Sequence, residues 1–144
     1  MRGFRRSALL ALACSALACG AASAADPVEG DWTPGSKVVV HVGPCAAGPE
    51  RLCGIVVAWP PDNEGRPELD SRDRNPKLTG RTLVGMTMFY GFHRTATGRW
   101  TGGKIYNPDD GRTYDAKLRA GANETLIVQG CFLFICGSRT WTRP

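Results

Sequence analysis

The chain is short and mildly basic: of its 144 residues, 42% are hydrophobic and 22% are charged, and the formal net charge is +5. This length suits one small domain, and the sequence contains no repeat and no low-complexity tail. The basic residues are interspersed with Asp and Glu rather than clustered on one face, so we expect no nucleic-acid partner.

The first predicted element is a secretory leader over residues 1–25. Its basic start, with Arg2, Arg5 and Arg6, precedes an apolar run that ends in Ala-Ser-Ala at residues 22–24. This order is typical of a cleaved signal peptide, because the run is too short and wrongly flanked for a transmembrane helix. We therefore expect a periplasmic or secreted protein whose mature part, residues 26–144, does not span the membrane.

Two further features of the leader matter. Cleavage removes three of the 18 basic residues and none of the 13 acidic ones, which leaves a net charge of about +2. Cys14 and Cys19 lie in the apolar run, so a lipoprotein leader is the alternative interpretation. Each of these cysteines has Ala where a lipoprotein signal usually carries Leu, and the Ala-Ser-Ala site explains the segment better.

Short strand patterns dominate the predicted mature domain. Turns rich in Gly, Pro and Asn separate them, which is typical of an antiparallel sandwich or barrel. The longest gap, residues 60–80, is polar and is predicted as a loop with at most one helical turn near residues 75–78. The strands are expected around Trp32 and at residues 38–42, 52–59, 83–92, 99–106, 112–119, 124–130 and 137–143.

Four cysteines remain after cleavage: Cys45, Cys53, Cys131 and Cys136. An even number in a small exported chain predicts two disulfides. Zinc binding is the competing interpretation, but the paired cysteines are separated by seven and four residues rather than by two. An oxidising compartment also favours disulfides. Four cysteines allow three connectivities, and their spacing alone does not choose among them.

The order of the connections narrows this choice. In an up-and-down sheet alternate connections share an end, so the loop at residues 60–80, the turn at 107–111 and the segment at 131–136 belong together. The link from Cys45 to Cys53 then lies at the opposite end. A disulfide needs Cα atoms within roughly 7 Å, and a cross-pairing would have to span the barrel. This geometry favours Cys45–Cys53 and Cys131–Cys136.

The segment NPDDG at residues 107–111 resembles part of a calcium loop. An EF-hand loop needs acids at its first, third and fifth positions and Gly at its sixth, and no register of this segment provides them. A turn explains every residue, since Asn107 can cap, Pro108 fixes φ and Gly111 supplies a positive φ. The five acids of the 60–80 loop are accompanied by four basic residues that would neutralise them. We expect no metal site and no cofactor.

Motifs of catalysis are missing from the sequence. No nucleophile elbow surrounds any Ser, and the segment CGSRTW at residues 136–141 has Arg139 where a papain-like enzyme carries its nucleophile. His41 and His93 lie on or beside predicted strands, and we interpret them as structural or exposed. Glycine-rich phosphate loops and zinc-protease motifs are not found either. The sequence predicts a protein that is not an enzyme.

Aromatic residues supply the candidate ligand site. Arg139, Trp141 and Arg143 alternate along one face of the last predicted strand. If the barrel closes by pairing its first and last strands, Trp32 and Arg143 meet with the cation over the indole. We interpret this pair as a plug of the closed end rather than as the lining of a cavity. The candidate ligand-binding residues are Trp32, Trp59, Tyr114, Phe132, Phe134 and Trp141.

The segment CFLFIC at residues 131–136 is unusual for a hairpin connection because it places four large apolar residues in a row. If these side chains are exposed, they form a contact for a partner protein, a lip for a ligand or a membrane-facing surface. If they are buried, they fold back over the mouth of the barrel. The sequence does not rank these alternatives.

The mature chain resembles an exported bacterial family, domain-of-unknown-function family 2147. The resemblance implies a small lipocalin-like β-barrel of about eight to ten strands and brings no established activity. Gly30-Asp31-Trp32 is similar to the lipocalin G-x-W element, and the link from Cys45 to Cys53 is longer than is usual in the family. The resemblance is carried by residues 26–32, 52–59, 75–78, 91–92, 98–114 and 138–143 and by Gly85.

Two functions follow from these observations. The first is binding of a small apolar or amphipathic ligand inside the barrel, in the cell envelope. The alternative is an envelope protein-interaction or structural module whose barrel is filled by side chains and holds no ligand. A partly apolar cavity of roughly 300 Å³ or more would favour the ligand, and a packed interior would favour the module.

Overall fold

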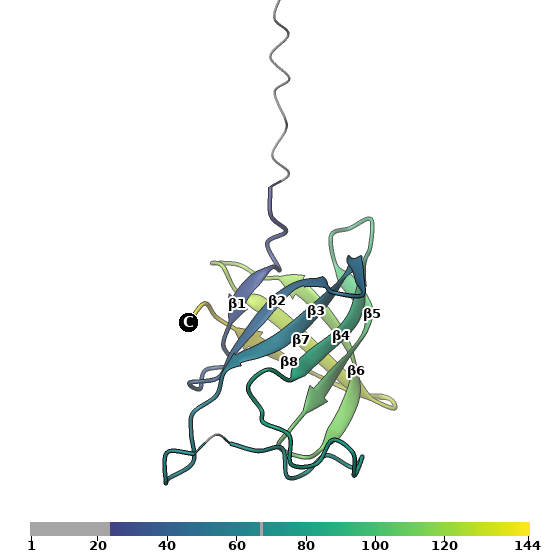
Figure 1. Cartoon of the computed structure of the whole chain (residues 1–144). Helices are drawn as coiled ribbons and strands as arrows, with labels where there is room; N and C mark the ends of the chain where they lie inside the picture. The colour runs from purple at the N-terminus through teal and green to yellow at the C-terminus, as the bar shows by residue number, and fades with distance from the viewer. Residues whose placement is uncertain (1–23, 67) are drawn as a thin grey trace, which may run out of the picture.

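The computed structural model describes residues 24–66 and 68–144, so the predicted leader lies almost wholly outside the described residues. The described residues form strands and no helix, and none of them makes a helix long and apolar enough to cross a membrane. The strands (Figure 1) are β1 (Gly30–Trp32), β2 (Val39–Cys45), β3 (Gly48–Ala58), β4 (Thr87–Arg94), β5 (Trp100–Asn107), β6 (Arg112–Ala120), β7 (Leu126–Phe132) and β8 (Ile135–Trp141).

Each strand pairs antiparallel with the next, and the order of strands in the sheet is their order in the sequence. This confirms the predicted all-β, antiparallel, up-and-down architecture. Tight turns make it possible, and the predicted turn between β5 and β6 is one of them. The Gly111 amide donates to the Asn107 carbonyl at 2.9 Å, the Asn107 side chain accepts from the Asp109 amide at 3.1 Å, and Gly111 has a φ of 67°.

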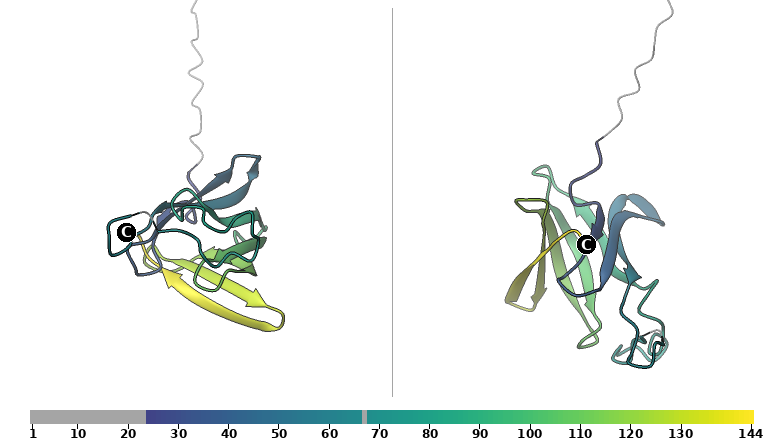
Figure 2. Two further views of the ribbon diagram at one scale, coloured as in Figure 1. Left: turned by 60° about the horizontal axis from the view of Figure 1, so that its bottom comes forward. Right: turned by 90° about the vertical axis from the view of Figure 1, so that its left-hand side faces the viewer.

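The sheet curls on itself but closes along only part of its seam. Among the described residues, the ends of the sheet meet at one bridge, where the amides of Thr33 and Thr142 donate to each other's carbonyls at 2.9 and 3.0 Å. Away from this bridge, the β7–β8 hairpin diverges from the first strands (Figure 2). The closed end is the one that carries the β2–β3, β4–β5 and β6–β7 turns. The open end carries the β1–β2, β3–β4, β5–β6 and β7–β8 connections.

The hydrophobic core fills the closed end. Trp32, Phe89 and Phe92 are no more than 1% exposed, and the ring centroids of the two Phe residues lie 6.0 Å apart in an edge-to-face arrangement. Such a pair contributes roughly 0.5–1.5 kcal/mol beyond its burial. Residues before β1 cover this end, because Val28 is fully buried and Asp26 pairs with Arg94 at 2.9 Å.

The predicted contact between Trp32 and Arg143 is confirmed. The Arg143 guanidinium carbon lies 3.7 Å from the centroid of the indole ring. Arg143 also donates to the carbonyls of Glu29 and Asp31 at 3.2 and 3.3 Å, and the indole N–H donates to the Val28 carbonyl at 2.8 Å. Because Nη1 of Arg143 and the indole N–H are both hydrogen-bonded to the backbone, the contact is held in place at the closed end, in agreement with the plug interpretation.

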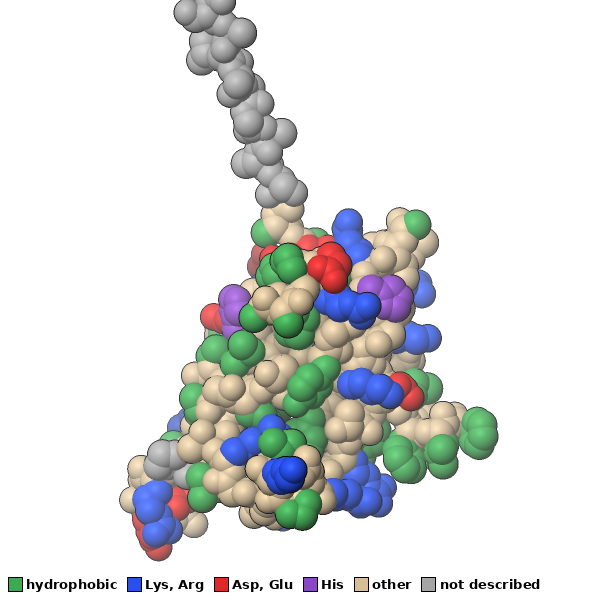
Figure 3. Space-filling model, turned by 45° about the vertical axis from the view of Figure 1, so that its right-hand side comes forward, with side chains coloured by type: hydrophobic (Ala, Val, Ile, Leu, Met, Phe, Trp, Pro, Cys, Tyr) green, Lys and Arg blue, Asp and Glu red, His purple; other side chains and the backbone are tan. Residues whose placement is uncertain are grey.

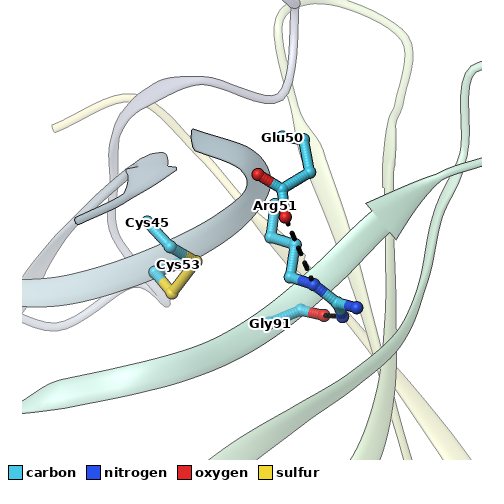
Figure 4. The surroundings of a disulfide bond; sticks show 5 residues. All are labelled: Cys45, Glu50, Arg51, Cys53 and Gly91. Atoms are coloured by element: carbon cyan, nitrogen blue, oxygen red, sulfur yellow. Dashed lines mark hydrogen bonds and ion pairs between the residues drawn. A yellow bond between two sulfur atoms is a disulfide. The ribbon is translucent and has the colours of Figure 1, made fainter. Parts of the chain in front are cut away.

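Both predicted disulfides are present. Cys45–Cys53 clamps the β2–β3 hairpin, where Arg51 donates to the Gly91 carbonyl at 3.1 Å and thereby ties the hairpin to β4 (Figure 4). Cys131–Cys136 clamps the β7–β8 hairpin at the opposite end of the barrel. The longer link between Cys45 and Cys53 is absorbed by a register shift in the pairing of β2 with β3.

The loop between β3 and β4 departs from the expectation of a fully solvated segment. It forms a hydrogen-bonded turn at Asn75, and Asp62 pairs with Arg66 at 2.9 Å within the loop, as the charge pattern indicated. Asp70, however, is buried against the wall of the barrel. Its carboxylate accepts from the Tyr106 hydroxyl at 2.8 Å and from the Arg81 guanidinium at 3.2 and 3.3 Å. This polar anchor fixes the loop to β5.

Candidate functional site

A cleft of about 920 Å³ opens between the walls of the barrel at its open end. Five strands, β4 to β8, and the β1–β2, β3–β4 and β5–β6 connections contribute to it, and most of the contributing side chains are apolar. The lining residues are Pro34, Ser36, Val38, Trp59, Pro60, Met88, Ile105, Tyr106, Asn107, Pro108, Asp109, Arg112, Tyr114, Val128, Gly130, Phe132, Ile135, Gly137, Arg139 and Trp141.

The alternation of side chains along β7 and β8 explains which of their residues line the cleft. Val128 and Phe132 on β7, and Ile135 and Arg139 on β8, all point to the inner face because strand side chains alternate. Between them, Gly130 pairs directly with Gly137. A Cβ atom on Gly137 would meet no other heavy atom within 4 Å. Two positions without side chains therefore lie side by side in this wall, where a packed barrel would carry large residues.

The floor of the cleft belongs to the core. Trp141 is only 6% exposed, and its ring centroid lies 5.3 Å from that of Phe89. Trp59 and Tyr114 are partly buried on the walls. Four of the six predicted ligand-binding residues, Trp59, Tyr114, Phe132 and Trp141, therefore line one space. Trp32 lies in the plug and Phe134 at the hairpin turn, and neither of them is among the lining residues.

Charged groups lie at the rim of the cleft. Arg112 and Arg139 contribute to its lining, together with the single acid Asp109. The Arg112 guanidinium is 5.4 Å from the centroid of the Phe132 ring, a cation–π distance. Tyr114 donates its hydroxyl proton to Asp110, and this hydrogen bond raises the pKa of Tyr114 above its ordinary value. The cleft thus combines an apolar interior with a charged rim that carries two arginines.

The β7–β8 hairpin leaves its apolar turn exposed. Leu133 is 78% exposed, Phe134 97% and Ile135 80%. Hydrophobic side chains project from the body of the molecule at the end of a protrusion (Figure 3). Of the alternatives that the sequence left open for residues 131–136, the structure supports the exposed one.

Sequence reasoning missed several lining positions. Met88, Ile105 and Val128 were counted only as parts of strands, and Pro34 and Ser36 only as parts of a connection. The inward register of β7, in which Val128, Gly130 and Phe132 alternate, was a signal that could have identified this wall. Among residues 24–66 and 68–144, no three His, Cys, Asp or Glu side chains cluster in a way that could hold a metal ion.

Comparison with known proteins identifies the family. The sequence pattern of a group described as uncharacterized protein conserved in bacteria (DUF2147) matches residues 30–143. The chain belongs to this family. The match spans all eight strands and includes both residues of the plug, Trp32 and Arg143. The predicted resemblance is confirmed, and the family description assigns no activity.

A solved structure supports the fold. Protein HP1028 from Helicobacter pylori, described as belonging to the lipocalin family, superposes with a TM-score of 0.65 over 81% of this chain and 82% of its own. The two sequences are 21% identical, so this likeness shows a lipocalin-like fold and nothing about a ligand. No curated protein has a sequence that matches this chain.

Proposed function

We propose that this chain binds one small apolar or amphipathic molecule in the open-end cleft, in the bacterial cell envelope. The cleft itself is the observation that carries the proposal. Its volume of about 920 Å³ falls within the range of roughly 300–1,000 Å³ that small-molecule sites occupy. Eight-stranded barrels, lipocalins among them, can enclose a single small ligand. The two disulfides are compatible with an exported protein.

The lining indicates which chemistry the ligand would have. Trp59, Val128 and Trp141 offer apolar contact area in the interior. Arg112 and Arg139 lie where the cleft meets solvent, and guanidinium groups favour carboxylate or phosphate partners. An elongated molecule with an apolar body and a polar or acidic end matches both parts of the cleft.

The alternative function, an interaction or structural module whose barrel is filled by side chains, agrees only with the packing at the closed end. Packing there is dense, but the open end retains a space that side chains do not fill. We favour a binding protein over an enzyme because no nucleophile, cofactor loop or metal-ligand pattern emerged from the sequence. The exposed hairpin turn is compatible with either function.

The experiment blocks the cleft without disturbing the fold. Gly137→Phe adds an aromatic ring on the inner face of β8, at a position where a Cβ atom meets nothing within 4 Å. Ser138→Phe, one residue further along β8, adds the same ring on the outer face and is the matched control. Binding is measured with an environment-sensitive fluorescent fatty acid and by native mass spectrometry after exposure to envelope lipid extracts.

We expect the wild-type chain and Ser138→Phe to take up the probe with similar affinity. Gly137→Phe should bind at least tenfold more weakly, a loss of about 1.4 kcal/mol. Melting temperatures of both variants should stay close to that of the wild type. Absence of any uptake by the wild type, or equal affinity in the two variants, would refute the cleft as the ligand site.

A further inference from the structure

The turn of the β7–β8 hairpin carries the largest exposed apolar side chains of the described chain. We call residues 132–135 the apolar tip. Phe132 is 46% exposed, and the next three residues are 78–97% exposed. Consecutive large apolar side chains exposed in this way mark an interaction site. The Cys131–Cys136 disulfide lies directly behind the tip and holds it in a fixed hairpin.

The backbone of the tip adds a second, independent observation. Leu133 has a φ of 54°, in the left-handed region that favours Gly, Asn or Asp. A turn selected only for folding would carry one of those residues. Departures from local sequence preference tend to occur at functional sites. Leu133 at this position therefore indicates that an apolar side chain is needed there for function.

The surroundings of the tip are basic. Arg112 lies over the Phe132 ring, and Arg139 lies on the same inner face of β8 as Ile135. The nearby acids are Asp109 and Asp110 on the β5–β6 turn. The Asp110 carboxylate accepts the Tyr114 hydroxyl, and the backbone carbonyl of Asp109 accepts a guanidinium N–H from Arg72, which brings a third arginine to this turn. Apolar side chains flanked by arginines match the interface of an anionic bilayer, which attracts basic groups and accepts aromatic rings.

The small size of the tip favours a bilayer over a protein as its partner. A stable protein interface takes about 800 Å² from each side, and a protruding hairpin turn of four residues offers less. A narrow apolar finger can enter a lipid interface without burying the polar body behind it. We propose that the apolar tip, residues 132–135, inserts into the interfacial region of a bilayer that contains anionic lipids.

The tip is continuous with the cleft. Phe132 and Ile135 belong to the tip and also line the cleft, so insertion brings the open end of the cleft to the membrane surface. This step rests on the proposed function and deepens it. The ligand is then a membrane-resident amphiphile, which passes between the bilayer and the cleft without crossing bulk water.

The test uses vesicle flotation with the purified chain, after mass spectrometry has established its N-terminus, because an uncleaved apolar leader would itself bind lipid. Vesicles contain phosphatidylethanolamine with phosphatidylglycerol, or phosphatidylcholine alone. The tip variant is Leu133→Asn combined with Phe134→Ser, in which Asn tolerates the positive φ. The matched control, Ile55→Thr with Val57→Thr, removes two side chains that are 45% and 48% exposed on β3.

We expect the wild type and the control to float with the anionic vesicles, less so at high salt, and to bind phosphatidylcholine more weakly. The tip variant should partition at least tenfold more weakly at an unchanged melting temperature. A Trp at position 134, introduced as Phe134→Trp, should be quenched by brominated lipids. No flotation of the wild type, or equal flotation of tip variant and control, would overturn the proposal. Loss of a cross-linked protein partner in the tip variant, without any vesicle binding by the wild type, would also overturn it.

The two proposals fail in distinguishable ways. If the tip variant still takes up the soluble fluorescent fatty acid while the wild type ignores vesicles, the cleft stands and the membrane contact does not. If Gly137→Phe binds vesicles normally but neither it nor the wild type takes up the probe, the membrane contact stands and the ligand site does not. If both proposals hold, the tip variant and Gly137→Phe should each take up the fatty acid from vesicles more slowly than the wild type.

Discussion

The two ends of this barrel are built by different interactions. At the closed end, Trp32, Phe89 and Phe92 are buried almost completely, and a cation–π contact with Arg143 seals the seam. At the open end, Gly130 and Gly137 lie side by side in the wall of a cleft of about 920 Å³, and every residue of β8 before Trp141 is exposed. Apolar packing dominates the first end, whereas the second leaves a cleft unfilled and is tied by polar contacts; each end also carries one hairpin disulfide.

This difference separates stability from binding. Large side chains concentrated at one end supply most of the hydrophobic free energy, so the other end can leave its interior unfilled. The open end still needs a defined shape, and the contact of buried Asp70 with Tyr106 and the Cys131–Cys136 disulfide supply it. Substitutions at the two ends should therefore have different consequences for unfolding.

The largest expected effect comes from the plug. Trp32→Ala removes a side chain that is 1% exposed and leaves the Arg143 cation without its ring. We expect the free energy of unfolding to fall by about 3–5 kcal/mol, the usual cost of removing a buried Trp or Phe. Urea unfolding followed by circular dichroism measures the loss.

Tyr114→Ala is the comparison at the open end. Tyr114 lines the cleft and is only partly buried, so we expect a loss of about 1 kcal/mol, near the average for single substitutions. Equal losses in Trp32→Ala and Tyr114→Ala would contradict the division between a packed end and an unfilled one.

The second prediction concerns the anchor of the long loop. Asp70→Ala leaves the Tyr106 hydroxyl and the Arg81 guanidinium without their shared acceptor. Breaking a buried charge pair in this way typically costs about 3–5 kcal/mol, and we expect the lower part of that range because Arg81 retains Asp73 at 3.1 Å. Urea unfolding gives the loss, and hydrogen exchange should show faster exchange in β5 and in the loop.

Asp62→Ala removes a carboxylate from the same loop and serves as the control. Its pair with Arg66 is solvent-exposed on the Arg side, so we expect little change in the free energy of unfolding. If the two Asp variants unfold alike, the loop is held by something other than the contact between Asp70 and β5.

Much of the architecture was readable from the sequence because the relevant signals are local. The β-branched run at residues 38–42 and the turn at Asn107–Gly111 fix strands and reversals through steric preferences alone. The pairing of the four cysteines followed from the parity of the connections. The contact of Arg143 with Trp32 followed from barrel closure, because only the first and last strands can meet there.

What the sequence did not reveal depends on distant partners. The environment of Asp70 looks like that of its exposed neighbours along the chain, and only the position of Tyr106, 36 residues away, makes it a buried acceptor. The cleft exists because β8 diverges from the first strands, and no alternation of residues specifies that angle. Phe134 was predicted in the site because it is aromatic, but the hairpin turn points it to solvent.

The smallest expected effect is a dependence of stability on alkaline pH. Burial raises the pKa of Tyr106 above its ordinary value of 10.0, and the hydrogen bond to Asp70 raises it further. Above pH 10 the unfolded chain therefore loses the phenol proton while the folded chain keeps it. Because the folded state then binds more protons, the free energy of unfolding falls as the pH rises.

Tyr106→Phe isolates this contribution. One proton that is bound only in the folded state makes the free energy of unfolding fall by up to about 1.36 kcal/mol per pH unit. We expect the variant to lose up to about that much of the wild-type slope above pH 10. Urea unfolding at several pH values between 9 and 11.5 measures it, with absorbance at 295 nm following tyrosinate. Tyr114→Phe, at the exposed rim, should leave a steeper slope than Tyr106→Phe. If both Phe variants keep the wild-type slope, the Tyr106 proton is not held by the fold, and the open end does not depend on the anchor at Asp70.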